Sequence, residues 1–146
     1  MKVFITQDKN NKDIFVEIHC SAIDSDIEKL NTYIFNYDKR IKANDEGETL
    51  YVELGDILYF ESVDNKTFIY TADRILTTSM KLYEIEEKLG EKDFFRCSKS
   101  VIVNIGKIKR LKPDLTRNIF ATLVNEETIV ISRRYVSAFK KLIKEE

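Results

Sequence analysis

The chain has 146 residues, which suffices for one domain with a hydrophobic core, or for such a domain and a small extension. Hydrophobic residues make up 43% and charged residues 34% of the sequence, a balance typical of a globular protein and not of a disordered one. The first residues lack the apolar stretch of a signal peptide, and the longest apolar run, Ile57 to Phe60, is far too short to cross a membrane. We therefore expect a cytoplasmic protein.

Charge is unevenly distributed along the chain. The formal net charge is −1, but residues 1–60 carry seven basic and twelve acidic side chains, a net −5, whereas residues 61–146 carry 17 and 13, a net +4. Residues 96–141 hold eleven basic and three acidic side chains, a net +8. Such a segment often forms only a solvated face, and a polyanionic partner is the competing interpretation.

Candidate metal ligands are few in this sequence. The two cysteines, Cys20 and Cys97, form no CxxC pair, which favours a reduced protein. His19 is the only histidine, and a zinc site built from His19, Cys20 and distant carboxylates would lack the usual ligand spacing. We predict no metal site and no cofactor.

The first 44 residues have a pattern of their own. Two apolar runs, residues 3–5 and 14–18, flank a turn-rich segment and predict a β-hairpin. The stretch Ser25-Asp26-Ile27-Glu28 has capping-box spacing and predicts a helix. The apolar face of this helix comprises Ile27, Leu30, Ile34 and Tyr37. We interpret residues 1–44 as an N-terminal extension that dimerises or receives a signal, and residues 45–146 as the main domain.

From about residue 41 apolar and polar residues alternate, a period typical of β-strands. Strands are predicted at residues 41–43, 49–52, 57–62, 68–71, 75–78, 101–103, 108–112, 119–123 and 128–131. A short helix is predicted between Ser79, as its cap, and Gly90, and a last helix buries Val136, Phe139 and Ile143. The predicted fold class is therefore mainly β with short helices (α+β). The basic half has no helix-turn-helix pair, so any DNA contact there would come from loops and helix ends.

Motifs of common enzymes are missing from the sequence. It has no GxSxG, P-loop, GxGxxG or HExxH pattern. Ser98 and Ser100 flank Lys99 without forming an SxxK motif. We do not expect an enzyme.

Two polar segments are candidates for contact with a polyanion. The hairpin tip Asp64-Asn65-Lys66-Thr67 is polar, although it also fits an ordinary turn. In the segment 94–100, short hydroxyls surround Lys99, which is the set of side chains found at phosphates. The aromatics Phe94 and Phe95 of this segment either anchor a core or stack on bases.

A third candidate, Ser132-Arg133-Arg134, opens the last predicted helix. Cations in a first helical turn oppose the helix dipole, at a cost of roughly 0.3–1 kcal/mol each at an exposed position. Departures from a local rule are common at functional sites, and arginine can read guanine through two hydrogen bonds. The alternative is that this arginine pair neutralises Glu126 or Glu127.

These segments resemble those of a known family in their order and spacing. The matching stretches are Tyr59-Phe60-Glu61-Ser62, Phe94-Phe95-Arg96-Cys97-Ser98-Lys99-Ser100-Val101-Ile102-Val103-Asn104, Lys107-Ile108 and Ile131-Ser132-Arg133-Arg134-Tyr135-Val136. Over roughly residues 45–143 the chain is similar to the LytTR DNA-binding domain. The resemblance implies a β fold of about ten strands that sets loops into successive major grooves on one face of DNA. The predicted DNA-binding residues are Asn65, Lys66, Thr67, Arg96, Ser98, Lys99, Arg133 and Arg134.

Two features depart from this family. Ser98 stands where many members have histidine, and only about 44 residues precede the domain, fewer than the ~100 of a typical independent domain. The chain therefore resembles short LytTR regulators that lack a phospho-acceptor receiver domain. The resemblance implies a bacterial transcriptional regulator that binds promoter repeats as a homodimer, with a small membrane protein as a further partner. The alternative function is a protein-interaction module that sequesters another regulator or docks on a membrane partner through its acidic N-terminal 60 residues.

Overall fold

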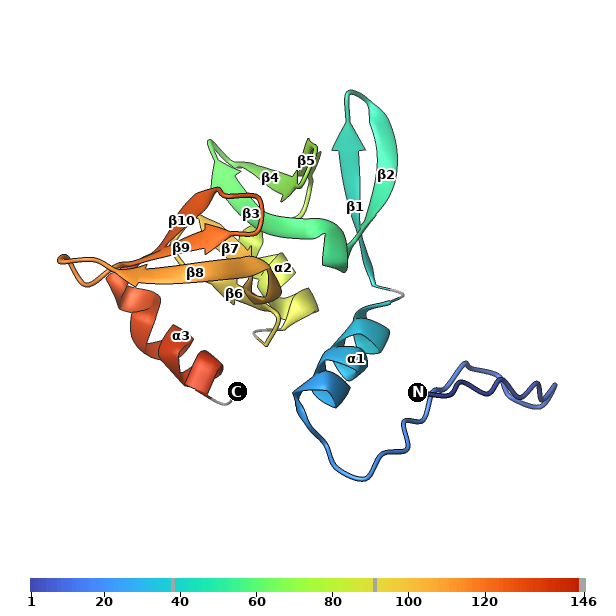
Figure 1. Cartoon of the computed structure of the whole chain (residues 1–146). Coiled ribbons are helices and arrows are strands. Elements are labelled where there is room, and N and C mark those ends of the chain that lie inside the picture. The colour runs from blue at the N-terminus through green and yellow to red at the C-terminus, as the bar shows by residue number, and fades with distance from the viewer. Residues whose placement is uncertain (38, 91, 145–146) are drawn as a thin grey trace.

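The computed structural model describes residues 1–37, 39–90 and 92–144, which form ten β-strands and three α-helices (Figure 1). The helices are α1 (Ser25–Asn36), α2 (Leu82–Leu89) and α3 (Arg133–Lys144). The strands are β1 (Arg40–Asp45), β2 (Glu48–Glu53), β3 (Ile57–Val63), β4 (Lys66–Thr71), β5 (Ile75–Thr78), β6 (Phe94–Arg96), β7 (Val101–Asn104), β8 (Ile108–Pro113), β9 (Ile119–Leu123) and β10 (Thr128–Ile131). The expected mainly β fold of about ten strands is confirmed.

The strands form two antiparallel sheets. The large sheet has the order β2-β1-β5-β4-β3-β7-β6, and the small sheet has the order β10-β9-β8. Helix α3 lies against the small sheet, whereas the N-terminal segment extends away from both sheets (Figure 1). The connections between neighbouring strands are short, so most of them are hairpins.

Strands β3, β6 and β7 of the large sheet are buried on both faces, whereas alternate residues of β1 are exposed. Because side chains alternate along a strand, consecutive residues of β6 and β7 enter different cores. Phe94 and Ile102 pack in the core that contains α2, whereas Phe95 and Val103 pack in the core that contains the small sheet and α3. The two adjacent aromatics are only 4% and 5% exposed, so they anchor the cores and do not stack on bases.

The predicted N-terminal hairpin is wrong. The chain turns at residues 8–11, where the Asn11 amide donates to the Asp8 carbonyl, but neither run of apolar residues forms a strand. The helix that follows is present, but its N-cap is Asp24 and not Ser25: the Asp24 carboxylate accepts from the Ile27 amide at 3.0 Å. Tyr37 lies beyond the helix and is exposed, because α1 ends at residue 36.

Details of the main domain also differ from the predictions. Helix α2 begins after Lys81, whose amide donates to the Glu84 carboxylate at 3.0 Å, so Ser79 is not its cap. Gly90 ends α2 with a φ of 76°, as predicted. Residues 94–96 form a strand that was expected to be loop, because pairing with β7 overrides the weak local signal. Strand β1 crosses the predicted boundary at 44/45 and carries core residue Ile41; the division into two units stays a prediction.

Phe139 couples α3 to the small-sheet core. Its side chain is fully buried, and its ring centroid lies 5.6 Å from that of Phe95. Phe139→Ala should therefore lower the free energy of unfolding by about 3–5 kcal/mol in urea denaturation, because it leaves a cavity. The neighbouring exposed variant Lys140→Ala should change it by less than about 0.5 kcal/mol. Equal stability of the two variants would contradict this packing.

Candidate nucleic-acid interface

The β3–β4 turn presents a lysine on a tight hairpin. Asp64 and Asn65 both have positive φ, 50° and 64°, as a two-residue type I′ hairpin requires. The Asn65 carbonyl accepts from Lys81 Nζ at 3.3 Å, which ties the turn to the start of α2. Asn65 and Lys66 are exposed, whereas Thr67 is only 3% exposed. Thr67 therefore does not lie on the surface where it was predicted to bind, because β4 turns it into the sheet.

The β6–β7 loop places Lys99 at its tip. The amides of Cys97 and Ser98 donate to the Val101 carbonyl at 3.0 and 3.4 Å, which folds residues 97–101 into a compact turn. Ser98 Oγ accepts from the Ser100 amide at 3.3 Å, so this hydroxyl shapes the loop from within. Lys99 is exposed and has no ion pair within the described part of the chain.

Arg96 supports this loop from behind. Its Nε donates to the Ser98 carbonyl at 2.9 Å, and its terminal nitrogens donate to the Lys99 carbonyl and to the Glu86 carboxylate of α2. The side chain is 23% exposed. Because the guanidinium is engaged with the loop and with α2, the geometry makes Arg96 a positioning residue for Lys99, whereas the sequence grouped it with the contact residues.

Arg133 and Arg134 form the first turn of α3, and both are exposed. The Arg133 amide donates to Asn118 Oδ1 at 2.9 Å, so a residue from the β8–β9 connection satisfies this end of the helix. Among residues 1–37, 39–90 and 92–144 neither guanidinium forms an ion pair. Two unpaired cations thus remain at the positive end of the helix dipole.

Glu126 and Glu127 are engaged elsewhere, which contradicts the alternative that they neutralise the arginine pair. Glu126 pairs with Lys109 and with Arg110, and the cation beside it lowers the pKa of its carboxyl group. Glu127 accepts from the Tyr59 hydroxyl at 2.7 Å and from Asn125. The arginine pair at the start of α3 keeps its charge uncompensated.

Two backbone hydrogen bonds join the three basic segments. The Ser62 amide, at the end of β3, donates to the Ser100 carbonyl at 2.8 Å, which sets the β3–β4 hairpin beside the β6–β7 loop. The Ser132 amide donates to the Cys97 carbonyl at 2.8 Å, which sets the start of α3 on the other side of the same loop. The loop is therefore the centre of a continuous basic edge. We call residues 64–66, 98–100 and 132–134 the basic edge.

A buried tyrosine, Tyr59, and a partly buried one, Tyr70, pack in the core that contains the small sheet and α3. Tyr59 and Tyr70 stack with centroids 4.2 Å apart, and the Tyr70 hydroxyl donates to Glu61 at 3.0 Å. Burial and the adjacent carboxylates raise the pKa of both tyrosines, so they remain neutral donors. Burial likewise raises the pKa of the Cys97 thiol to about 12, so Cys97 stays protonated at neutral pH. These three side chains are therefore neutral at neutral pH and add no negative charge near the basic edge.

Sequence reasoning missed two residues that shape the basic edge. Glu86 belongs to no motif in the sequence, yet its carboxylate holds Arg96. Asn118 sits in a loop with no motif, yet it caps α3 from across the domain. Nothing in the sequence spacing of either residue signals these contacts, which arise only when separate segments meet in the fold.

None of the three described helices is long and apolar enough to cross a membrane.

The structure is an antiparallel β domain in which a hairpin tip, a loop and a helix start lie side by side and each carry at least one exposed cation, Lys66, Lys99 and the Arg133-Arg134 pair, the charge pattern expected of a domain that meets a polyanion. The family model of the LytTr DNA-binding domain matches residues 47–144, and the chain belongs to this family. A solved LytTr DNA-binding domain from Bacillus cereus, assigned to a methyl-accepting/DNA response regulator, superposes with a TM-score of 0.68 at 29% identity. The match covers 71% of this chain and 95% of that one.

Three named relatives are regulators or signalling proteins. The chain is 31% identical over 91 residues to the transcriptional regulatory protein YpdB of Escherichia coli (strain K12) and 33% identical over 92 residues to the sensory transduction protein LytT of Bacillus subtilis (strain 168). These alignments cover only 37% and 38% of the relatives' own length. An uncharacterized HTH-type transcriptional regulator of Staphylococcus aureus (strain NCTC 8325 / PS 47) is 23% identical over 143 residues, 97% of each chain.

Proposed function

We propose that this protein is a cytoplasmic, sequence-specific regulator of transcription that binds repeated half-sites in double-stranded DNA as a homodimer. The observation that carries the proposal is the basic edge, whose three segments are joined by the Ser62–Ser100 and Cys97–Ser132 hydrogen bonds. The exposed side chains of this edge that would contact DNA are Asn65, Lys66, Lys99, Arg133 and Arg134, with the partly exposed Ser98 beside them. The proposal assigns no catalytic reaction to the chain.

The chemistry of the basic edge suggests a division of roles. Lysine is a flexible point charge suited to phosphate, whereas the planar guanidinium of arginine can pair with guanine O6 and N7. We assign Lys66 and Lys99 to the DNA backbone and Arg133 or Arg134 to a base. Placing two arginines at a helix start costs roughly 0.3–1 kcal/mol each in the free protein, and a nearby phosphate would offset that cost.

One relative supports the further proposal of a regulator that works without a receiver domain. The Staphylococcus aureus regulator aligns over 97% of its own length with 97% of this chain, so a regulator of this size exists in that organism. A small membrane protein remains the further partner that we propose on the family resemblance.

A gel-shift assay on the upstream region of the protein's own gene, followed by selection of sites from random DNA, tests the proposal. We expect duplex binding at low salt and recovery of a repeated sequence. If no duplex is bound below micromolar protein at low salt, the DNA-binding proposal fails. The alternative, a protein-interaction module acting through the acidic N-terminal 60 residues, would then be favoured.

Lys99→Ala tests the contact between the β6–β7 loop and phosphate. Each phosphate contact releases counterions, so the plot of log affinity against log salt should become shallower by about 1 in this variant. The exposed lysine Lys88, at the end of α2 and outside the basic edge, provides the matched control Lys88→Ala. An unchanged slope and affinity in Lys99→Ala would remove Lys99 from the interface.

Arg134→Ala tests base reading at the start of α3. We expect it to lose preference at one base position, at a cost of about 1–3 kcal/mol on the preferred sequence. Binding measured against a set of single-base operator variants would locate that position. A uniform loss on every sequence would show that Arg134 contacts only the DNA backbone.

Glu86→Gln tests whether Arg96 positions the loop or touches DNA. The ion pair is partly exposed and is worth up to ~1 kcal/mol, so affinity should fall by up to about fivefold while the salt slope stays unchanged. The loss should be smaller in a Lys99→Ala background, because both changes act on one contact. Additive losses, or a salt slope that becomes shallower in Arg96→Gln than in Glu86→Gln within the Lys99→Ala background, would instead make Arg96 a phosphate contact.

A further inference from the structure

The N-terminal segment exposes more large apolar side chains than a free surface normally does. Phe4, Ile5 and Ile14 are 85%, 93% and 96% exposed, and Val3, Phe15 and Val16 are exposed as well. Contiguous apolar surface of this kind commonly marks a protein contact. In the described structure neither sheet covers these side chains, since the segment extends away from them (Figure 1).

The same segment has a strand sequence but no strand partner. Ile14, Val16 and Ile18 alternate with Phe15 and Glu17, the period of a β-strand with one apolar face. The backbone of these residues belongs to no sheet, although the residue types favour one. A segment with a strand sequence that pairs with no strand of its own chain can form its backbone hydrogen bonds with the same segment of another copy.

We propose that residues 14–18 pair antiparallel with the same residues of a second copy of this chain, about a twofold axis at Val16. In this register Val16 lies opposite Val16 of the partner subunit, and Ile14 lies opposite Ile18 of the partner subunit. One face of the two-stranded ribbon then carries an unbroken apolar stripe. This inference deepens the proposed function and rests on it, because it supplies the interface of the proposed homodimer.

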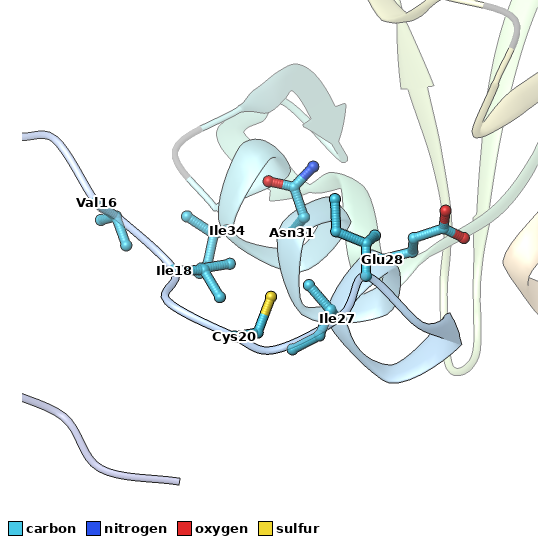
Figure 2. A pocket seen from close by; sticks show the side chains of 8 residues that line it. Val16, Ile18, Cys20, Ile27, Glu28, Asn31 and Ile34 are labelled. Carbon is cyan, nitrogen blue, oxygen red and sulfur yellow. The ribbon is translucent and has the colours of Figure 1, made fainter.

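Helix α1 provides the surface on which this stripe packs. An open hollow of about 390 Å³ lies between the segment and the helix. Figure 2 shows Val16 and Ile18 from the segment and Ile27 and Ile34 from α1 around this hollow. Ile27 and Ile34 are half-buried. The pairing would place the apolar faces of both strands over both copies of α1, which forms a layer of strands on a layer of helices.

The sequence and charge of this surface favour a second copy as the occupant. Residues 14–18 read Ile-Phe-Val-Glu-Ile, so pairing about Val16 sets apolar residues opposite apolar residues along the face of Ile14, Val16 and Ile18 in both copies. Residues 1–37 hold four basic and six acidic side chains, a net −2. That small negative charge neither attracts DNA or anionic lipid nor strongly repels a second copy.

The molar mass of the protein in solution, measured without DNA, tests whether two copies associate. Light scattering coupled to size-exclusion chromatography should show a dimer for the full chain. Val16→Asp should weaken the dimer at least roughly tenfold, since it places two charges on the axis. Leu115→Asp introduces the same charge at a fully exposed apolar residue of the β8–β9 turn and should leave the dimer intact. A monomeric wild type, or a Val16→Asp variant that dimerises as tightly, would overturn the proposal.

A cysteine cross-link tests the axis directly and does not depend on a destabilising change. Opposed residues of an antiparallel pair have Cα atoms about 4.5–5.5 Å apart, within the range of a disulfide. Val16→Cys, made with Cys20→Ser to remove the exposed native thiol, should form a covalent dimer with oxidised glutathione. Leu115→Cys in the same background should not. A dimeric protein in which Val16→Cys fails to cross-link would contradict this register.

DNA binding separates this inference from the proposed function. A Val16→Asp monomer should bind a single half-site with wild-type affinity and lose only the added affinity for two half-sites. If the protein dimerises through Val16 but binds no duplex, the regulator proposal fails and the pairing stands. If half-sites are bound by a protein that is never dimeric, the pairing and the homodimer both fail, and the DNA-binding part of the proposed function stands.

Discussion

The structure depends on the burial of one end of the large sheet, strands β3, β7 and β6, from both sides. Strands β3, β6 and β7 send alternate side chains into two cores, so a pair such as Phe94 and Phe95 fastens α2 on one face and the small sheet with α3 on the other. Sheets covered on both faces read as continuous apolar runs, and this one does so at Ile57 to Phe60. The loops at one end of these strands are held in place because the strands on either side of each loop are packed in both cores. Residues on short loops can therefore hold fixed positions without a helix-turn-helix scaffold.

Arginines in and behind the basic edge have two opposed uses. Arg96 turns inward and binds two loop carbonyls and a carboxylate, whereas Arg133 and Arg134 remain exposed at the start of α3. The inward arginine satisfies carbonyls that a tight turn cannot pair internally. The outward pair adds positive charge where the helix dipole already favours an anion. One residue type thus provides both the support and the charge of this surface.

Much of the fold was predictable because alternating apolar and polar residues mark the strands, and turn-forming residues such as glycine, asparagine and aspartate mark where they end. Strands β5, β9 and β10 lie where the pattern placed them, and Gly90 ends α2 as expected. The predicted N-terminal hairpin is absent from the described structure, because a strand pattern in the sequence does not say where the hydrogen-bond partner of that strand lies. Thr67 and Arg96 show the corresponding limit for the site. The identity of a polar residue near a turn does not reveal whether it points outward, since β4 buries Thr67 and the loop carbonyls bind Arg96.

The hydrogen bond from the Arg133 amide to Asn118 has a consequence for how such a domain can change over evolutionary time. Asn118 lies in the connection between β8 and β9, yet it sets where α3 begins and hence how its arginines are aimed. Substitutions, insertions or deletions in that connection can change the direction of the Arg133 and Arg134 side chains while both residues stay arginine. Domains with the same basic residues can thus present them in different directions through changes in a connection that lies outside the basic edge.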